Sequence, residues 1–323
     1  MSYKSLFDLL KKYDTEEKCR DFFADCRWHG KVVCPHCGNA GEKKITKIER
    51  GVYKGGFKCF SCRKRFSIRT NTFMGESLIK FQKWLMAIFL LTSHKKGLSS
   101  LQLAKDIGVS QKTAWFMIQR ILNIVGSEDI KLGGVVEVDE TYVGGKESNK
   151  HRDRRTMNFD KGAGDKTAIL GMIERGGNVV LKKFDKVNKA NILPHIEHHI
   201  AENAIINTDE SSIYKGALSG RERRIVNHNA GQYSFGENTT NRVEGMFSHL
   251  KRMVNGIHIW LSKKHMQKYT DLFCFRMNTR ALNEYERIAA LLTRTDNSRI
   301  MWKEVVAIGA YDTKEENHCG DTR

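Results

Sequence analysis

The chain has 323 residues, of which 40% are hydrophobic, so it is long enough to fold as two or three domains with a sizeable core. Lysine and arginine number 55 against 37 acidic residues, and the net charge of +18 favours a polyanionic partner, nucleic acid ahead of an anionic membrane. The longest apolar run is too short to span a bilayer, and the first residues lack the apolar stretch of a signal peptide. We therefore expect a cytoplasmic protein without a membrane-spanning segment.

Taken in chain order, the pattern predicts helices over residues 1–33, a ribbon of short strands with glycine turns over 34–72, and helices again over 78–125. Apolar runs alternate with helical segments from about residue 132 to 280, which indicates an α/β or α+β domain. Within it, the polar residues 146–166 predict a mobile loop, and the tail after residue 312 is expected to be disordered. We divide the chain into four parts: 1–72, 73–131, 132–280 and 281–323, the last a helical extension with a polar tail.

Two CxxC pairs lie in the ribbon, Cys34 with Cys37 and Cys59 with Cys62. Each pair makes a tight knuckle that aims two thiolates at one metal, and two knuckles complete the tetrahedral Cys₄ site that Zn²⁺ accepts best. Such a site has no open position, so we expect one structural zinc ion rather than a catalytic one. His36 lies inside the first knuckle, and we interpret it as a solvent-facing spacer.

Residues 97–121 have the pattern of a helix-turn-helix. Ser99 or Ser100 can cap a first helix that ends at Ile107, Gly108 supplies the turn, and Ser110 caps a second helix that runs to about Ile121. The predicted inner face consists of Leu101, Ala104, Ile107, Val109, Ala114 and Ile118. Groove-reading side chains usually begin the second helix, where the chain has Gln111, Lys112 and Thr113. An ordinary helical hairpin is the alternative.

Two aspartates follow apolar runs that we expect to be strands. Asp139 follows residues 135–138, and Asp209 follows residues 204–208. Carboxylates at strand ends meet at the edge of a sheet, where they can share metal ions, although aspartate also commonly ends strands for structural reasons. Glu137 shares a strand face with Asp139 by the two-residue period, so it could contribute to the site or be structural.

A helix predicted over residues 239–253 offers a third acid. Its buried stripe consists of Val243, Phe247 and Leu250. Glu244, Ser248 and Lys251 lie on one face, so the helix presents a carboxylate and a cation together. A solvated face with an ion pair would have the same pattern.

Three carboxylates suit phosphodiester chemistry. Two Mg²⁺ ions about 3.5–4 Å apart activate the attacking oxygen and stabilise the leaving one. One aspartate that bridges both ions, with one further carboxylate for each, is the smallest scaffold, and Mn²⁺ suits the same oxygen ligands. Lys251, and Arg252 beside it, could then hold a DNA phosphate near the site.

With these motifs, the chain resembles the bacterial insertion-sequence transposases of the DDE superfamily. It is most similar to the group that has a zinc ribbon and a helix-turn-helix before the catalytic core. The resemblance covers most of residues 15–280 and rests on CPHCG with CFSCRKRFSIRTNTFM, KKGLSSLQLAKDIGVSQKTAWFMIQRI, VEVDETYVGGK, and TTNRVEGMFSHLKRMVNGIHIWLSKKHMQKYTDLFCFRMN. It implies a ribonuclease H-like core with a mixed sheet, Asp139 on the first strand and Asp209 on the fourth. Lys251 matches the family's basic residue.

The resemblance also implies a function. A transposase of this kind binds the terminal inverted repeats of its element, cuts the DNA at the ends, and joins the 3′-hydroxyls to target DNA. Two ends must be held together, so we expect a homodimer or a larger assembly, associated with the nucleoid when bound to DNA.

Two site residues have alternatives. Some relatives use asparagine as the third metal-facing residue, and Asn241 lies one turn before Glu244; we prefer Glu244 because a carboxylate offsets the charge of a divalent ion. His228 lies before the last core helix and could approach the metals or be an ordinary loop histidine.

Three other functions fit parts of the pattern. A DNA-binding regulator without catalysis would use the ribbon and helix-turn-helix but leaves residues 132–280 unexplained. A ribonuclease H-like nuclease would cut without joining. A transposase that has lost mobility would tend to lose its acids, whereas all three are present.

Overall fold

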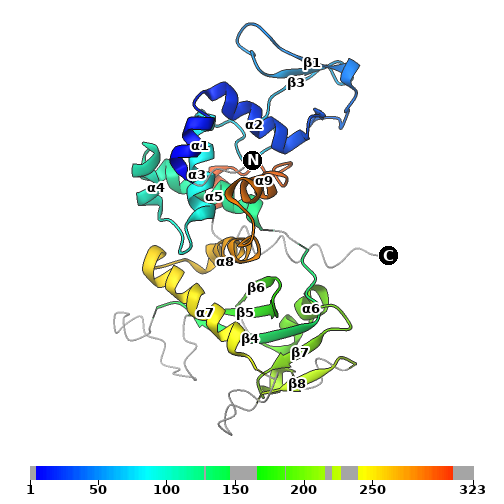
Figure 1. The fold of residues 1–323 in the computed structure, drawn as a ribbon, viewed down its shortest axis with the longest axis vertical. Helices are drawn as coiled ribbons and strands as arrows, with labels where there is room; N and C mark the ends of the chain where they lie inside the picture. Colours follow the sequence, from blue (N-terminus) through cyan, green and yellow to red (C-terminus); the bar gives the residue numbers. More distant parts are fainter. Residues whose placement is uncertain are drawn as a thin grey trace. The chain divides into compact units, whose positions relative to one another are not determined.

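The computed structural model describes residues 5–126, 129–145, 166–185, 187–214, 220–226 and 239–307 (Figure 1). The chain divides into two compact units, Met1–Gly126 with Ala281–Arg323, and Ser127–Arg280. His228, the tail after residue 312, and all of the loop predicted over 146–166 except Lys166 lie outside the described residues. Within the described part of the chain, no helix is both long and apolar enough to cross a membrane.

The first unit begins with two helices and a ribbon. Helices α1 (Leu6–Lys12) and α2 (Glu16–Trp28) precede three short antiparallel strands in the order β1-β2-β3, namely β1 (Ile45–Lys47), β2 (Phe57–Cys59) and β3 (Arg65–Phe66). The ring of Trp28 meets those of Phe57 and Phe66 edge-on at 5.3 and 6.1 Å between centroids. This aromatic cluster joins the end of α2 to the ribbon, as expected for a small domain with little other core.

The rest of the first unit is helical. It contains α3 (Phe81–Ser93), α4 (Ser100–Ile107), α5 (Gln111–Val125), α9 (Glu284–Leu292) and α10 (Trp302–Val306). Helix α9 packs against α2, α3 and α5, although it lies far from them in sequence. Polar contacts add to this packing, since Asn123 Nδ2 donates to the carbonyl of Ser298 at 3.2 Å and Arg27 pairs with Asp296 at 2.6 Å. The described part of the C-terminal segment therefore belongs to the first unit.

The second unit is built on a five-stranded mixed sheet in the order β6-β5-β4-β7-β8. The strands are β4 (Val135–Val143), β5 (Thr167–Glu174), β6 (Val179–Phe184), β7 (Ile205–Thr208) and β8 (Arg223–Ile225). Strands β4, β5 and β6 pair antiparallel, whereas β7 and β8 continue the sheet in parallel from β4. This topology confirms the predicted mixed sheet of a ribonuclease H-like core.

Helices cover the sheet of the second unit. Two branched side chains of α6 (Lys189–His199), Ile192 and Ile196, lie in one buried cluster with Val136 and Val138 of β4. Helix α7 (Asn241–Met253) packs against β4 and β5, and α8 (Lys263–Asn278) packs against β6 (Figure 1). Alternate residues of a strand face opposite sides of the sheet, so the residues of β4 between the valines face away from the α6 cluster.

A close approach fixes where α7 crosses the sheet. Gly171 of β5 lies opposite Asp139 of β4 in the strand register. A Cβ at Gly171 would lie 2.6 Å from the Phe247 ring and 2.8 Å from Cε of Met246, so only glycine leaves room for α7 at this level. The predicted buried stripe of the helix is confirmed, since Val243, Phe247 and Leu250 are all buried.

Candidate functional site

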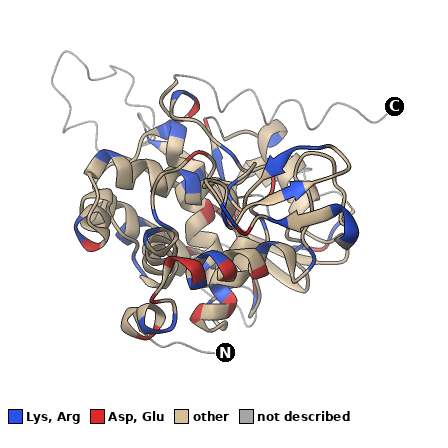
Figure 2. Cartoon of the chain, turned by 90° about the horizontal axis from the view of Figure 1, so that it is seen from above, with Lys and Arg blue, Asp and Glu red and all other residues tan. Residues whose placement is uncertain are grey.

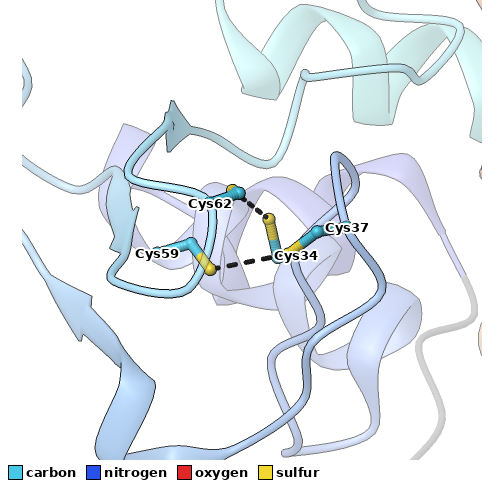
Figure 3. Close-up of side chains that lie close together, drawn as sticks. All are labelled: Cys34, Cys37, Cys59 and Cys62. Atoms are coloured by element: carbon cyan, nitrogen blue, oxygen red, sulfur yellow. Dashed lines mark hydrogen bonds between the residues drawn. The ribbon is translucent and has the colours of Figure 1, made fainter.

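The four knuckle cysteines converge in the ribbon, as the sequence predicts (Figure 3). Sγ of Cys34 lies 3.7 Å from Sγ of Cys62, and Sγ of Cys37 lies 3.7 Å from Sγ of Cys59. A zinc ion bound at 2.3 Å by four sulfurs requires sulfur separations of about 3.8 Å, so these spacings fit a tetrahedral site. The donor set, four thiols within 4.8 Å of one another, therefore suits Zn²⁺.

The backbone of the second knuckle prepares one thiol for metal binding. Backbone N–H groups of Cys62 and Ser61 lower the pKa of Cys59 to about 6, toward the thiolate that zinc requires. The side-chain amide of Asn39 lies 3.9 Å from the same sulfur. His36 is exposed, and its Nε2 lies 3.3 Å from the carbonyl oxygen of Arg65, outside the cysteine cluster.

The two aspartates lie side by side on the sheet. Strand β7 pairs in parallel with β4, with Val135 opposite Ile205 and Glu137 opposite Asn207. The same register, continued by two residues, sets Asp139 opposite Asp209 on strands about 4.8 Å apart. Their charges both reach Glu140, because burial and then the carboxylates of Asp139 and Asp209 raise the pKa of Glu140 to about 7.

One detail of the strand prediction is wrong. The sequence suggests that the first core strand ends at Asp139, but β4 continues to Val143 and pairs with β5 along that length. Thr141, Tyr142 and Val143 favour extended structure, and β5 supplies their hydrogen-bonding partners. Asp139 is thus inside β4, at the level where the parallel neighbour β7 has just ended. Asp209 directly follows β7, as predicted.

Glu137 holds the start of α7 against this part of the sheet. Its side chain is fully buried, and Oε2 accepts hydrogen bonds from the backbone N–H groups of Arg242 and Val243 at 2.9 and 3.3 Å. Its Oε1 accepts a hydrogen bond from Nε of Arg175 at 3.1 Å. The first N–H groups of a helix have no partner within the helix, so a buried carboxylate there both satisfies them and complements the helix dipole.

Asn207 makes a second link at the same level. Its side chain is fully buried on β7, opposite Glu137, and Nδ2 donates to the carbonyl of Thr239 at 3.4 Å. The two strands therefore hold the start of α7 from neighbouring positions, one strand period before Asp139 and Asp209. The two-residue period connects Glu137 with Asp139, but the sequence contains no signal that Glu137 would cap a helix more than a hundred residues further on.

The third acid lies in the first turn of the helix that Glu137 caps. Glu244 is exposed, and Oγ1 of Thr240 donates to its Oε1 at 3.4 Å. Asn241, the competing residue, is the first residue of α7 and is also exposed. Lys251 and Arg252 are exposed in the last turn of α7.

The three acids are not gathered as tightly as the cysteines. Among the described residues, two groups of three or more Cys, His, Asp or Glu have ligand atoms within 4.8 Å of one another, and Asp139, Asp209 and Glu244 do not form such a group. The second group is Asp129 with His198 and His199. In that group Asp129 pairs with Nε2 of His198 at 2.8 Å and Nδ1 of His199 lies 3.1 Å from the carbonyl of Ile130, so these residues tie the approach to β4 onto the end of α6.

The predicted pair of helices is present in the first unit. Ser99 caps α4, Gly108 makes the turn at φ +62°, and Ser110 caps α5. The predicted inner face is wrong at Leu101, which is 58% exposed, whereas Leu103 is fully buried. The helical period explains the difference, because Leu103, with Ala104 and Ile107, lies on the face toward α5.

The three residues expected to read DNA all have partners within the unit. Nε2 of Gln111 donates to Oγ of Ser100 at 2.8 Å, and the hydroxyls of Thr113 and Ser110 lie 2.8 Å apart. Lys112 is exposed, and its ammonium lies 4.8 Å from the centroid of the Trp302 ring in α10.

Two family models match the chain. Residues 131–278 match the ISXO2-like transposase domain, and residues 14–65 match the transposase zinc-ribbon domain. The chain thus carries two transposase domains. The ribbon and the mixed sheet described above occupy the two matched ranges.

A relative comes from the archaeon Halobacterium salinarum. It is described as an uncharacterised protein in transposable element ISH50, is 26% identical over 283 residues, and is matched over 83% of this transposase and 92% of its own length. This relative, which aligns over almost its full length, is therefore encoded in a transposable element.

Two solved structures were also compared. The simian T-cell lymphotropic virus intasome in complex with PP2A regulatory subunit B56 gamma matches 60% of this chain and 65% of its own, at 11% identity and a TM-score of 0.27. The Mos1 transposase paired-end complex with left transposon end matches 62% of this chain and 76% of its own, at 13% identity and a TM-score of 0.25.

Proposed function

We propose that this transposase binds the terminal inverted repeats of its element, cuts the DNA strands at its ends, and joins the resulting 3′-hydroxyls to target DNA. The observation that carries the proposal is the parallel register of β4 with β7, which leads Asp139 and Asp209 to the same level of the sheet, beside the capped end of the helix that bears Glu244. The match of residues 131–278 to a transposase domain supports this reaction class.

The residues at this position suit two Mg²⁺ or Mn²⁺ ions. Carboxylate oxygens are the hard ligands that both ions accept, and neighbouring parallel strands would present the two carboxylates from adjacent positions. When bound, the two ions activate the attacking oxygen and stabilise the leaving oxygen. Asp139 and Asp209 would hold both ions, with Glu244 as the third ligand and Lys251 on a backbone phosphate.

Glu137 and Asn207 have a supporting part in the proposal. Both act through α7, because the Glu137 carboxylate and Nδ2 of Asn207 are hydrogen-bonded to the start of the helix. Their effect is to fix the position of Glu244 relative to the two aspartates, to the accuracy that metal-dependent chemistry requires.

The first unit would deliver the chemistry to particular DNA ends. Its zinc ribbon and helix pair are small modules that occur in DNA-binding proteins, and basic side chains are spread over many elements of the chain (Figure 2). Gln111, Lys112 and Thr113 would read base edges, and Lys251 with Arg252 would contact phosphates. Two ends cut together require at least a dimer.

The proposal is tested with linear DNA that carries the inverted repeats from the flanks of the gene. Asp139→Asn and Asp209→Asn should each abolish magnesium-dependent strand cleavage and leave binding to the repeats unchanged. Asp185→Asn is the matched control, because Asp185 also follows a strand of the same sheet, is 71% exposed on its side chain, and lies outside the site. Normal cleavage by either site variant would refute the assignment.

The identity of the third ligand is tested by comparing Glu244→Gln with Asn241→Ala. We expect the first to abolish cleavage and the second to reduce it much less; the reverse result would assign the position to Asn241.

A second assay separates joining from cutting. Pre-cleaved ends with free 3′-hydroxyls should be joined to a supercoiled target by the wild-type protein. Cleavage without joining would indicate a nuclease, and binding without either reaction would indicate a regulator.

A further inference from the structure

The chain makes a strained turn where α7 ends. A π-helical segment, η5 (Val254–His258), follows α7, and then Ile259 adopts φ +60° and ψ −49°. The N–H of Trp260 donates to the carbonyl of His258 at 2.5 Å, which closes a γ-turn of the rare positive-φ type. A β-branched residue at positive φ is a true outlier, and both such strain and π-helical segments are concentrated at functional sites.

The turn displays two large apolar side chains. Ile259 is 82% exposed and Trp260 is 71% exposed. The residues beneath them are held firmly, since Val254 is buried and the His258 ring packs edge-on against buried Tyr269 at 4.6 Å. Single exposed apolar residues are common on protein surfaces and need no explanation. Here, however, two adjacent ones are presented by a backbone conformation that a relaxed turn would avoid.

The positive charge around the turn favours a negatively charged partner. No aspartate or glutamate occurs from Gly245 to Thr270, whereas Lys251, Arg252, Lys263 and Lys264 in that range are exposed or partly exposed. Lys251 and Arg252 are exposed one turn before η5. An aromatic side chain within a basic surface matches single-stranded or unstacked DNA, in which the phosphates meet the cations and a base meets the ring.

We propose that Trp260 stacks on an unpaired DNA base, with Ile259 beside it as a wedge and with Lys251 and Arg252 on the adjoining phosphates. Helix geometry places the turn about 20 Å from Glu244, too far to touch the reacting atoms, so the contact holds DNA and takes no part in the chemistry. The inference rests on the proposed DNA binding by this transposase. It adds a site that binds DNA where the two strands are separated.

The test uses the full chain with zinc, in buffer without magnesium or manganese so that no strand is cut. One probe is a 20-nucleotide single strand with a central 2-aminopurine, and the other is the same sequence as a blunt duplex. The wild-type protein should quench the 2-aminopurine of the single strand. Trp260→Ala should bind that strand about tenfold more weakly and lose the quenching, with less than a twofold change for the duplex.

Two controls keep the result specific. Trp260→Phe should retain most of the binding and quenching, because it keeps an aromatic ring. Leu78→Ala, which removes a 99% exposed apolar side chain from the first unit, should change neither. All variants should melt at the wild-type temperature, since the altered side chains are exposed.

Unchanged binding and quenching in Trp260→Ala would refute the inference and leave the catalytic proposal intact. The inference would equally fail if Trp260→Ala converted a dimer to a monomer in sedimentation without weakening DNA binding, because the turn would then contact a second copy. Conversely, intact quenching by a wild-type protein that never cuts its ends would refute the catalytic proposal alone.

Discussion

Glu137 links the sheet to the start of α7, so we expect it to fix the position of Glu244, the third acid. Its carboxylate accepts three hydrogen bonds while fully buried, from Arg242 N, Val243 N and Arg175 Nε. Glu137→Ala would leave two helix N–H groups and the Arg175 guanidinium without their partner. Removal of one member of a buried charged pair costs about 3–5 kcal/mol, a large share of the roughly 5–15 kcal/mol that stabilises a domain.

Glu137→Gln is the more informative change, because its shape is nearly the same. The amide keeps one accepting oxygen and loses both the charge and the second acceptor, which should cost about 1–2 kcal/mol. The variant should therefore remain folded at 25 °C with a looser start of α7.

The assays are urea unfolding, amide hydrogen exchange, and strand cleavage. Glu137→Gln should lower the urea midpoint, speed exchange at the amides of Arg242 and Val243, and slow cleavage while binding to DNA ends is retained. Glu222→Gln is the matched control, since Glu222 forms an exposed ion pair with Arg224 at 2.8 Å and such pairs contribute little. Wild-type exchange at both amides in Glu137→Gln would refute the reasoning.

Three further predictions concern packing, zinc and pH. Gly171→Ala should destabilise the protein by about 1–3 kcal/mol, because its Cβ meets the Phe247 ring at 2.6 Å, and an unchanged melting temperature would contradict this. Cys34→Ser should reduce bound zinc and weaken binding to DNA ends, as measured by metal analysis and band shift; a full zinc content would exclude the Cys₄ site. Burial lowers the pKa of His199 to about 4, below its ordinary 6.5, so the unfolded state binds the proton first and stability should fall as the pH drops from 6.5 to 4. His199→Gln should flatten that part of the curve of melting temperature against pH, and an identical slope would count against it.

Local patterns made part of the fold predictable. The cysteine pairs lie at fixed short spacings, so Cys34 and its partners could be placed around one metal before the fold was known. The caps of the helix pair, Ser99 and Ser110, are also local, and both are confirmed. The position of Asp209 was predictable for the same reason, because it directly follows an apolar run that forms a strand.

Long-range packing was beyond the reach of the sequence. The role of Glu137 depends on a helix that begins at residue 241, and the space at Gly171 depends on Phe247 of the same helix. Likewise, nothing in residues 284–292 indicates that they pack with α3, or that Trp302 covers Lys112. These contacts are set by the tertiary fold, which hydrophobic period and turn residues do not specify.

The most direct test of the account is the position of bound Mn²⁺ in a crystal of the full chain, located by anomalous scattering. We expect manganese between the carboxylates of Asp139 and Asp209, with Glu244 drawn toward it and with no peak in crystals of Asp139→Asn. Manganese bound elsewhere, with none between these two aspartates in the wild-type protein, would contradict the account.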